Sequence, residues 1–493
     1  MTTLFRFAWL ASLFVLAAAC GSTDEVSSAF GGPGGGGAGD FGATQGGIQD
    51  MSFARDTIAA GRVPPPEAFV VEAMFSEHDL PLEGEPCDTL FCLRAANGLA
   101  PSETDEPSAW VQVGMSSTID PETFKRPSLS VVAVVDVSGS MGWDYGDSGN
   151  PGGLAKALLE RIAAELGEND RVSIVTYGSS SRVHLAPVQA IERERISDAI
   201  QALQSGGSTN MEAGMTLGYE VAGGEAGRAE QVRLMLFTDV QPNVGLTEAS
   251  EFERLARGGA DSGAGLTVFA LCLGLNPDVL RGMSQIRNAN AFSLTEPEDV
   301  PSLMEDSWPW IASPIAHELV LRVTASEGFD VAEGYGFPES TVDEASMSVS
   351  SVFLSRRRGA LLLRIEAEAG SDVSFDALSV DLALEYETLD GEVRSEAFTK
   401  GFSALSDEAP FEQASVYKTV ALARLVSAMK EAAEIYGTDQ DGAVAVQQRA
   451  HTQFEDALME LEDRALEPER ELSAALLSLM RSGASQESFY GGF

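Results

Sequence analysis

Apolar runs and apolar–polar alternation divide the chain into regions of different secondary structure. Residues 129–135 are apolar apart from Ser130, which is typical of a strand buried on both faces of a sheet. Residues 154–166 repeat apolar side chains at helical spacing, and strand-like and helix-like segments then alternate to about residue 312. This alternation predicts an α/β fold, with a doubly wound, mainly parallel sheet and right-handed crossovers.

Further elements of the α/β region follow from the same patterns. The additional strands are expected at residues 171–177, 232–238 and 266–273. The additional helices are expected at residues 191–203, 211–222, 248–257 and 278–286.

The segments on either side of the α/β region have the pattern of β-structure. Residues 66–126 resemble short strands between turns, and residues 109–115 alternate faces as a strand does. After Pro314, strands are expected at residues 317–323, 360–366 and 378–386. We predict one β-sandwich with the α/β domain inserted into it, since insertion at an exposed loop is well tolerated. Two separate small β modules are the alternative.

The C-terminal part of the chain has the pattern of helices. They are expected at residues 414–436, 444–466 and 468–480, before a Gly/Ser-rich end. The predicted division of the chain is a signal peptide at residues 1–20, a Gly-rich flexible tether at 21–62, the two parts of the sandwich at 63–126 and 313–406, the α/β domain at 127–312, a helical region at 410–481 and a loose tail at 482–493.

The N-terminus has the features of an export signal. Arg6 precedes an apolar run at residues 7–19, which ends in small residues and is too short for a stable transmembrane helix. Cys20 follows directly, an arrangement that resembles the lipobox of bacterial lipoproteins. The resemblance implies that Cys20 is lipidated and anchors an exported protein in the cell envelope, at the outer membrane or in the periplasm. A simple secreted protein is the alternative.

The net charge disfavours some kinds of binding partner, and the cysteines indicate a structural disulfide. Asp and Glu number 75 against 32 Lys and Arg, for a net charge of -43, which disfavours binding to nucleic acid or to anionic lipid headgroups. Cys87 and Cys92 lie five residues apart in a polar segment, and export would permit a disulfide between them. Two cysteines without a histidine cluster make a poor zinc site, so we predict a structural bridge. Cys272 lies in an apolar run and is expected in the core.

Three polar segments follow or precede elements of the predicted sheet. Asp136-Val-Ser138-Gly-Ser140 follows the first strand, residues 206–210 open a helix, and Asp239 ends a later strand. Doubly wound sheets place ligands beyond the carboxyl ends of their strands, so these segments are expected to meet there. Carboxylate and hydroxyl oxygens suit hard divalent cations, while the lack of His and Cys disfavours zinc and copper.

Asp136, Ser138, Ser140, Thr209 and Asp239, in this order, resemble the metal-ion-dependent adhesion site (MIDAS) of von Willebrand factor A domains. The resemblance implies that the three hydroxyl side chains approach Mg²⁺, or Mn²⁺ or Ca²⁺, directly, and that the two aspartates act through water. It also implies that an acidic group of a protein partner completes the coordination shell. Residues 72–81, residues 242–245 and the C-terminal helical pattern are similar to bacterial exported proteins in which β-rich segments flank such a domain and helices follow it, and this likeness covers most of residues 65–480.

An enzymatic role is not expected. A serine nucleophile needs a neighbouring base, usually histidine, and none of the four histidines lies in the three polar segments. We therefore expect a metal-dependent binding module on a membrane tether, with no small-molecule substrate. Two alternatives are a scaffold or chaperone for assembly of an envelope complex, and a structural envelope protein with a vestigial metal site.

Overall fold

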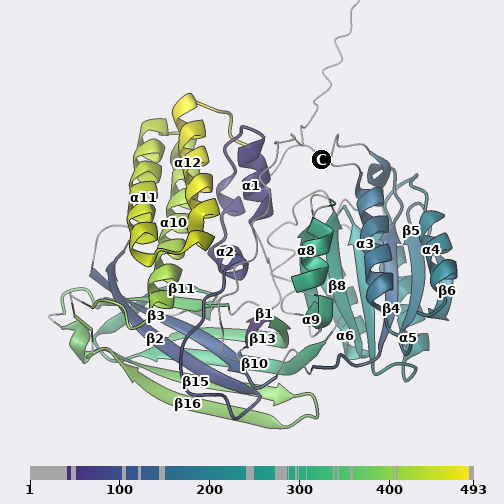
Figure 1. The fold of residues 1–493 in the computed structure, drawn as a ribbon, viewed down its shortest axis with the longest axis horizontal. Helices are drawn as coiled ribbons and strands as arrows, with labels where there is room; N and C mark the ends of the chain where they lie inside the picture. Colours follow the sequence, from purple (N-terminus) through teal and green to yellow (C-terminus); the bar gives the residue numbers. More distant parts are fainter. Residues whose placement is uncertain are drawn as a thin grey trace, which may run out of the picture.

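The computed structural model describes most of the chain beyond its N-terminal segment. Described are residues 41–45, 51–102, 107–119, 124–143, 150–239, 249–271, 286, 288–294, 297, 299–306, 308–311, 313–336, 339–340, 344–355, 359–371, 373–403, 405–406 and 409–487. The predicted signal peptide with Cys20, the residue Cys272 that is expected in the core, and the helix expected at residues 278–286 lie outside them, except for Ile286. Figure 1 shows an α/β unit beside a large β-sheet, with a group of helices over one side of that sheet.

The α/β unit contains a six-stranded sheet in the order β6-β5-β4-β7-β8-β9. Its strands are β4 (Leu129–Asp136), β5 (Arg171–Tyr177), β6 (Arg182–Gln189), β7 (Gln231–Thr238), β8 (Ala264–Leu271) and β9 (Ala289–Leu294). All neighbours pair in parallel except β6, which pairs antiparallel with β5 at the edge. The structure thus confirms the mainly parallel, doubly wound sheet. The strands β6 and β9 were not predicted.

Both faces of this sheet are covered by helices. Side chains of β4 alternate: Val131 and Val135 contribute to one hydrophobic cluster, and Val132 and Val134 to the other. The first cluster includes residues of α3 (Pro151–Glu165), α4 (Arg193–Gln201), α8 (Asp299–Asp306) and α9 (Trp308–Ile311). The second includes residues of α5 (Met211–Glu225) and α6 (Ala249–Asp261).

The β-structure on both sides of the α/β unit forms one antiparallel ten-stranded sheet, in the order β11-β14-β3-β1-β13-β10-β15-β16 with β2 on β3 and β12 on β13. Its strands are β1 (Phe41–Gln45), β2 (Phe91–Pro101), β3 (Pro107–Ser117), β10 (Pro314–Ala325), β11 (Phe329–Tyr335), β12 (Glu339–Ser340), β13 (Glu344–Ser355), β14 (Leu361–Ala367), β15 (Ser379–Thr388) and β16 (Val393–Gly401). Because β3 pairs with β14, the segments before and after the α/β unit belong to one body, and the α/β unit lies between β3 and β10 in the chain.

The strands predicted to form one β-sandwich belong to a single ten-stranded sheet, whose first half contains β2, β3, β11 and β14 and whose second half contains β10, β13, β15 and β16. The strand β1 pairs with β3 on one side and β13 on the other, and so joins the two halves. The halves face each other across one apolar core, where the rings of Phe91 and Tyr386 lie 5.0 Å apart. A side-chain N–H of Asn97 donates to the Gly401 carbonyl at 2.8 Å, which brings β2 close to β16.

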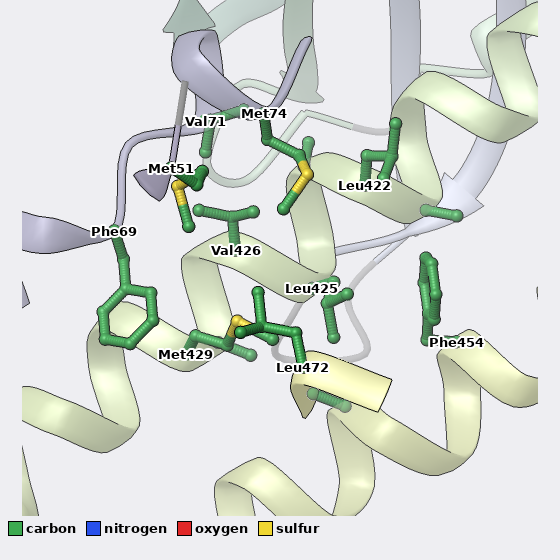
Figure 2. Packing of buried hydrophobic residues seen from close by; sticks show 14 of the residues in the cluster. Met51, Phe69, Val71, Met74, Leu422, Leu425, Val426, Met429, Phe454 and Leu472 are labelled. Carbon is green, nitrogen blue, oxygen red and sulfur yellow. The ribbon is translucent and has the colours of Figure 1, made fainter. Parts of the chain in front are cut away.

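The C-terminal helices α10 (Ala414–Tyr436), α11 (Gln440–Leu461) and α12 (Glu467–Ser482) form the predicted helical region. They share a core with α1 (Ser52–Ala59), the short 3₁₀ turn η1 (Pro66–Ala68) and α2 (Val71–Glu77). Figure 2 shows Met51, Phe69 and Met74 from the N-terminal segment close to Val426 and Met429 of α10. The first and last parts of the chain therefore pack together.

Two predicted boundaries are corrected by this packing. The tether of residues 21–62 is wrong at its C-terminal end, where residues 41–45 form a strand and residues 51–62 pack as a helix and turn. The short strands expected from residue 66 are wrong up to residue 90, since this segment contains η1 and α2 and the strand β2 begins at Phe91. The helices α1 and α2 are eight and seven residues long, so their sequences are too short to show the apolar periodicity by which a helix is recognised.

The predicted loose tail is also wrong over its first part. The Val63 N–H donates to the Ser485 carbonyl at 3.0 Å, and the Glu487 N–H donates to the Val63 carbonyl at 2.8 Å. Arg62 forms an ion pair with Glu487. These contacts fix the chain after α12 against the segment after α1, while residues 488–493 lie outside the described part.

A disulfide joins Cys87, in the turn before β2, to Cys92 within that strand. In the part of the chain that the structure describes, no helix has the length and apolar character needed to cross a membrane.

Candidate metal centre

Three neighbouring strands end at one edge of the α/β sheet. Asp136 at the end of β4 pairs with Tyr177 at the end of β5, and β4 also pairs in parallel with β7, which ends at Thr238. Parallel pairing places all three carboxyl ends on the same side. Asp136, Tyr177 and Asp239 consequently begin their loops together at this edge.

Backbone hydrogen bonds hold the loop before α5 against the other loops. The Gly206 N–H donates to the Val137 carbonyl at 2.7 Å, and the Gly139 N–H donates to the Gly207 carbonyl at 3.0 Å. Gly207 has a φ of +97°, and a β-carbon there would lie 2.5 Å from the Ser179 Oγ, so this position requires glycine. The loop thereby carries Thr209, which is 1% exposed, to the strand ends.

Hydrogen bonds orient the oxygen atoms around Asp136. Its Oδ1 accepts from the Ser138 N–H at 2.8 Å, and its Oδ2 accepts from the Thr238 hydroxyl at 3.3 Å. The hydroxyls of Ser138 and Ser140 lie 3.1 Å apart. Asp136 and Ser138 are buried, and Ser140 is half-buried, so the group opens toward solvent on the Ser140 side.

Two carboxylates are buried in this edge. Asp136 and Asp239 are each 1% exposed. Burial raises the pKa of Asp136 to about 6, hydrogen bonds from Ser138 oppose that shift, and the negative charge of Asp239 adds to it. Burial and the Asp136 carboxylate also raise the pKa of Tyr177 well above its usual value, so this phenol stays protonated. A bound cation would offset the repulsion between the two carboxylates.

Helix N-termini add positive potential near the same edge. The helix α5 begins one residue after Asn210, whose side chain accepts from the Ala213 N–H at 3.0 Å. The first turn of α3 also lies close, since a β-carbon on Gly152 would be 2.8 Å from the Met141 carbonyl and 3.1 Å from the Ser205 Oγ. The partial positive charge of helix N-termini favours anionic groups nearby.

The donor set fits a small hard cation. Two carboxylates and three hydroxyls, from Asp136, Asp239, Ser138, Ser140 and Thr209, are all oxygen ligands of the type that Mg²⁺ prefers. Across the described ranges, no group of three or more His, Cys, Asp or Glu could hold a metal, so a metal here would depend on the hydroxyls. When bound, such a metal would offer a Lewis-acidic position to an anionic oxygen of another molecule.

The predictions from sequence did not include Tyr177 and Ser179 among the residues of the centre. They also missed that the Thr238 hydroxyl donates to Asp136. The signal that could have found Tyr177 and Thr238 is their position at the ends of predicted strands, next to the expected metal loop. The sequence carries no such signal for Ser179, whose hydroxyl accepts from the Ser208 N–H at 3.1 Å.

The four histidines interact with groups elsewhere in the fold. Their partners are the Ala199 carbonyl for His184, the Ser351 hydroxyl for His317, Glu469 for His78 and the Ser473 hydroxyl for His451. None of these four partners belongs to the three loops of the candidate metal centre.

Residues 131–241 match the family model described as von Willebrand factor type A domain, a range that begins within β4, ends three residues after β7 and includes Asp136 and Asp239. The α/β unit is a von Willebrand factor type A domain. Over 216 residues the chain is 29% identical to the Escherichia coli (strain K12) protein named "Uncharacterized protein YfbK". This match covers 43% of the chain and only 36% of that relative's length.

Solved structures with von Willebrand or pilus descriptions also resemble the chain. A von Willebrand factor type A protein from Catenulispora acidiphila has 13% identity and a TM-score of 0.45, over 83% of this chain and 99% of that one. The three N-terminal domains of the type V pili tip protein Mfa5 from Porphyromonas gingivalis have 12% identity and a TM-score of 0.29, over 64% of this chain and 78% of that one.

Proposed function

We propose that the von Willebrand factor type A domain is a metal-dependent protein-binding module. Mg²⁺, or Mn²⁺ or Ca²⁺, would be held by Asp136, Ser138, Ser140, Thr209 and Asp239, and an acidic group of a protein partner would occupy the remaining position. The observation that carries the proposal is the pair of buried aspartates, with serine and threonine hydroxyls from separate loops fixed around them.

Neutral oxygen ligands would leave the cation with much of its charge. Of the five side chains, only the two aspartates carry charge, and three hydroxyls supply the rest. A cation held in this way keeps a strong attraction for another carboxylate. We accordingly propose adhesion-type binding and not catalysis, since none of the described histidine contacts provides a base beside the serines.

We also propose that the chain is exported and anchored through a lipid on Cys20. The disulfide between Cys87 and Cys92 supports an oxidising compartment, and the glycine-rich segment up to residue 40 would then separate the folded body from the membrane. Mass spectrometry of the purified chain should find an acylated Cys20 as its first residue. A Cys20→Ala variant should leave the membrane fraction, and unchanged fractionation with an unmodified N-terminus would refute the anchor.

The binding proposal is tested with full-length protein immobilised and exposed to envelope extracts in Mg²⁺ or in EDTA. Asp136→Ala removes a buried member of the centre, and Asp261→Ala removes an exposed aspartate at the end of α6 as a matched control. We expect the same partner band with wild type and Asp261→Ala in Mg²⁺, and its loss with EDTA or Asp136→Ala. Equal recovery in EDTA, with circular dichroism unchanged, would contradict the proposal.

A further inference from the structure

A large apolar side chain stands exposed at the rim of the candidate metal centre. Trp143 is 59% exposed, whereas Trp110 and Trp308 are 0% and 4% exposed. The Trp143 N–H donates to the Ser140 carbonyl at 2.9 Å, which fixes its backbone directly beside the metal loop. Exposing an indole to water forgoes the stabilisation that its burial would provide.

The adjoining loop is in contact with the same turn. A β-carbon on Gly142 would lie 3.2 Å from the Ser205 Cβ, so the turn that carries Trp143 packs against the loop that carries Thr209. Ser205 is exposed, and so are Gly206 and Gly207 beside it. Trp143 therefore belongs to a continuous surface formed by the two loops.

The described segments that form this surface carry no charged side chain, although the chain has a net charge of -43 and Asp144 and Asp147 follow Trp143 in the sequence. The described residues 137–143, 178–181 and 204–210 contain no charged side chain, and serines at positions 179, 180 and 205 are exposed among them. An acidic partner is repelled by most of the protein but meets no negative side chain in these three segments. These three segments therefore add no negative charge of their own that would repel an acidic group.

We propose that Trp143 is the apolar anchor of the partner-binding face, and that the partner is a protein segment with an acidic side chain next to an aliphatic or aromatic one. This inference rests on the proposed function of the metal centre. The acidic group would be recognised at the metal centre, and its apolar neighbour would cover the indole of Trp143. Exposed tryptophans that become buried in an interface commonly carry much of its binding energy.

The test uses the full chain in Mg²⁺ and three fluorescently labelled synthetic peptides. The first carries one glutamate flanked by leucines, the second has serines in place of these leucines, and the third has glutamine in place of the glutamate. Dissociation constants are measured by fluorescence anisotropy for wild type, Trp143→Ala, Trp143→Phe and Ile191→Ala. Ile191 is a matched control, because it is also 59% exposed.

We expect wild type to bind the leucine-flanked peptide about tenfold more tightly than the serine-flanked one. Trp143→Ala should abolish that preference, Trp143→Phe should keep most of it, and Ile191→Ala should not change it. Acrylamide quenching of tryptophan emission should fall when the leucine-flanked peptide binds to wild type. The proposal would be overturned if wild type bound both peptides equally or bound neither of them. It would also be overturned if Trp143→Ala kept the full preference for the leucine-flanked peptide.

Two further outcomes separate this inference from the proposed function. If Asp136→Ala and the glutamine peptide bind as well as their counterparts, the metal-centre function fails whatever Trp143 does. If glutamate binding requires Mg²⁺ and Asp136 but is indifferent to Trp143, only the present inference fails. A dimer in sedimentation equilibrium that Trp143→Ala dissociates would assign the surface to a second copy and would also overturn it.

Discussion

Gly214 of α5 lies directly on the ring of Tyr177 at the end of β5, where a β-carbon would be 2.5 Å from the ring Cδ1. One turn later, a β-carbon on Gly218 would be 2.5 Å from the Val134 Cγ2 of β4. The two glycines allow α5 to lie close against the sheet. Since Thr209 lies two residues before this helix, the packing of the two glycines also determines where Thr209 meets the strand ends.

Replacing Gly214 with alanine should destabilise the domain. The added methyl group must displace the buried Tyr177 ring, and overpacking of this kind costs roughly 1–3 kcal/mol. Gly223→Ala in the same helix is the matched control, since its β-carbon would have no atom within 4 Å. That control should be neutral or stabilising by up to about 1 kcal/mol, because alanine is the better helix former. Urea unfolding gives the free energy of unfolding of both variants, and equal values for the two would refute this account.

The entry into the von Willebrand domain depends on a buried ion pair. Arg126 donates to both carboxylate oxygens of Asp170, which also accepts from the Leu129 N–H at 2.8 Å and the Gly167 N–H at 2.7 Å. The Arg126 guanidinium also lies 6.0 Å from the ring centre of Trp308, just before the exit from the domain. The pair therefore connects the two ends of the inserted unit.

We expect Asp170→Ala to cost roughly 3–5 kcal/mol, because it leaves a nearly buried guanidinium unpaired. The control is Arg161→Ala, which breaks an exposed helical pair with Glu165 and should cost about 0.5 kcal/mol or less. Chemical denaturation followed by circular dichroism gives both values. A loss in Asp170→Ala as small as in the control would contradict the role assigned to the pair.

The same pair gives a pH dependence. Burial alone favours the neutral acid, but hydrogen bonds from Arg126 and from two backbone N–H groups outweigh it and lower the pKa of Asp170. The ionised pair should therefore stabilise the fold fully above about pH 4, the ordinary aspartate value, and less as the pH falls through the lowered pKa. Wild type should lose more stability than Asp170→Asn between about pH 5 and pH 2. If the free energy of unfolding changed with pH in the same way for wild type and Asp170→Asn, the ion pair would not contribute to the pH dependence.

Reduction of the disulfide should lower stability modestly. Cys87 and Cys92 lie five positions apart in the sequence, and closing so short a loop in the unfolded chain stabilises the folded state by about 2 kcal/mol. Double replacement of the two cysteines by serine should lower the melting temperature and make it insensitive to dithiothreitol. A wild-type melting temperature that is unaffected by dithiothreitol would show that the bridge does not contribute.

The α/β unit could be predicted from sequence because each element carries its own pattern. The strand at residues 129–135 is apolar on both faces, and the polar residues after it mark the carboxyl end where ligands gather. In contrast, β6 is a partly exposed edge strand with a Pro at position 187, and its weak alternation did not identify it.

The regions that were mispredicted depend on long-range packing. The strand β1 follows a glycine-rich segment, and its pairing with β3 and β13 involves residues more than 70 positions away in the sequence. The short helix α2 is stabilised by α10, which lies more than 300 residues later in the chain. Local propensity carries little information where tertiary contacts decide the conformation.

The central claim is that the five oxygen-bearing residues bind a divalent cation. The most direct test is the melting temperature of the full chain as Mg²⁺ is increased, for wild type, Asp136→Ala, Thr209→Ala and the exposed-surface control Asp261→Ala. A ligand that binds only the folded state stabilises it progressively as its concentration exceeds the Kd. Our account predicts a rise for wild type and the control, and none for the two site variants. No rise for wild type, or the same rise in Asp136→Ala, would contradict it.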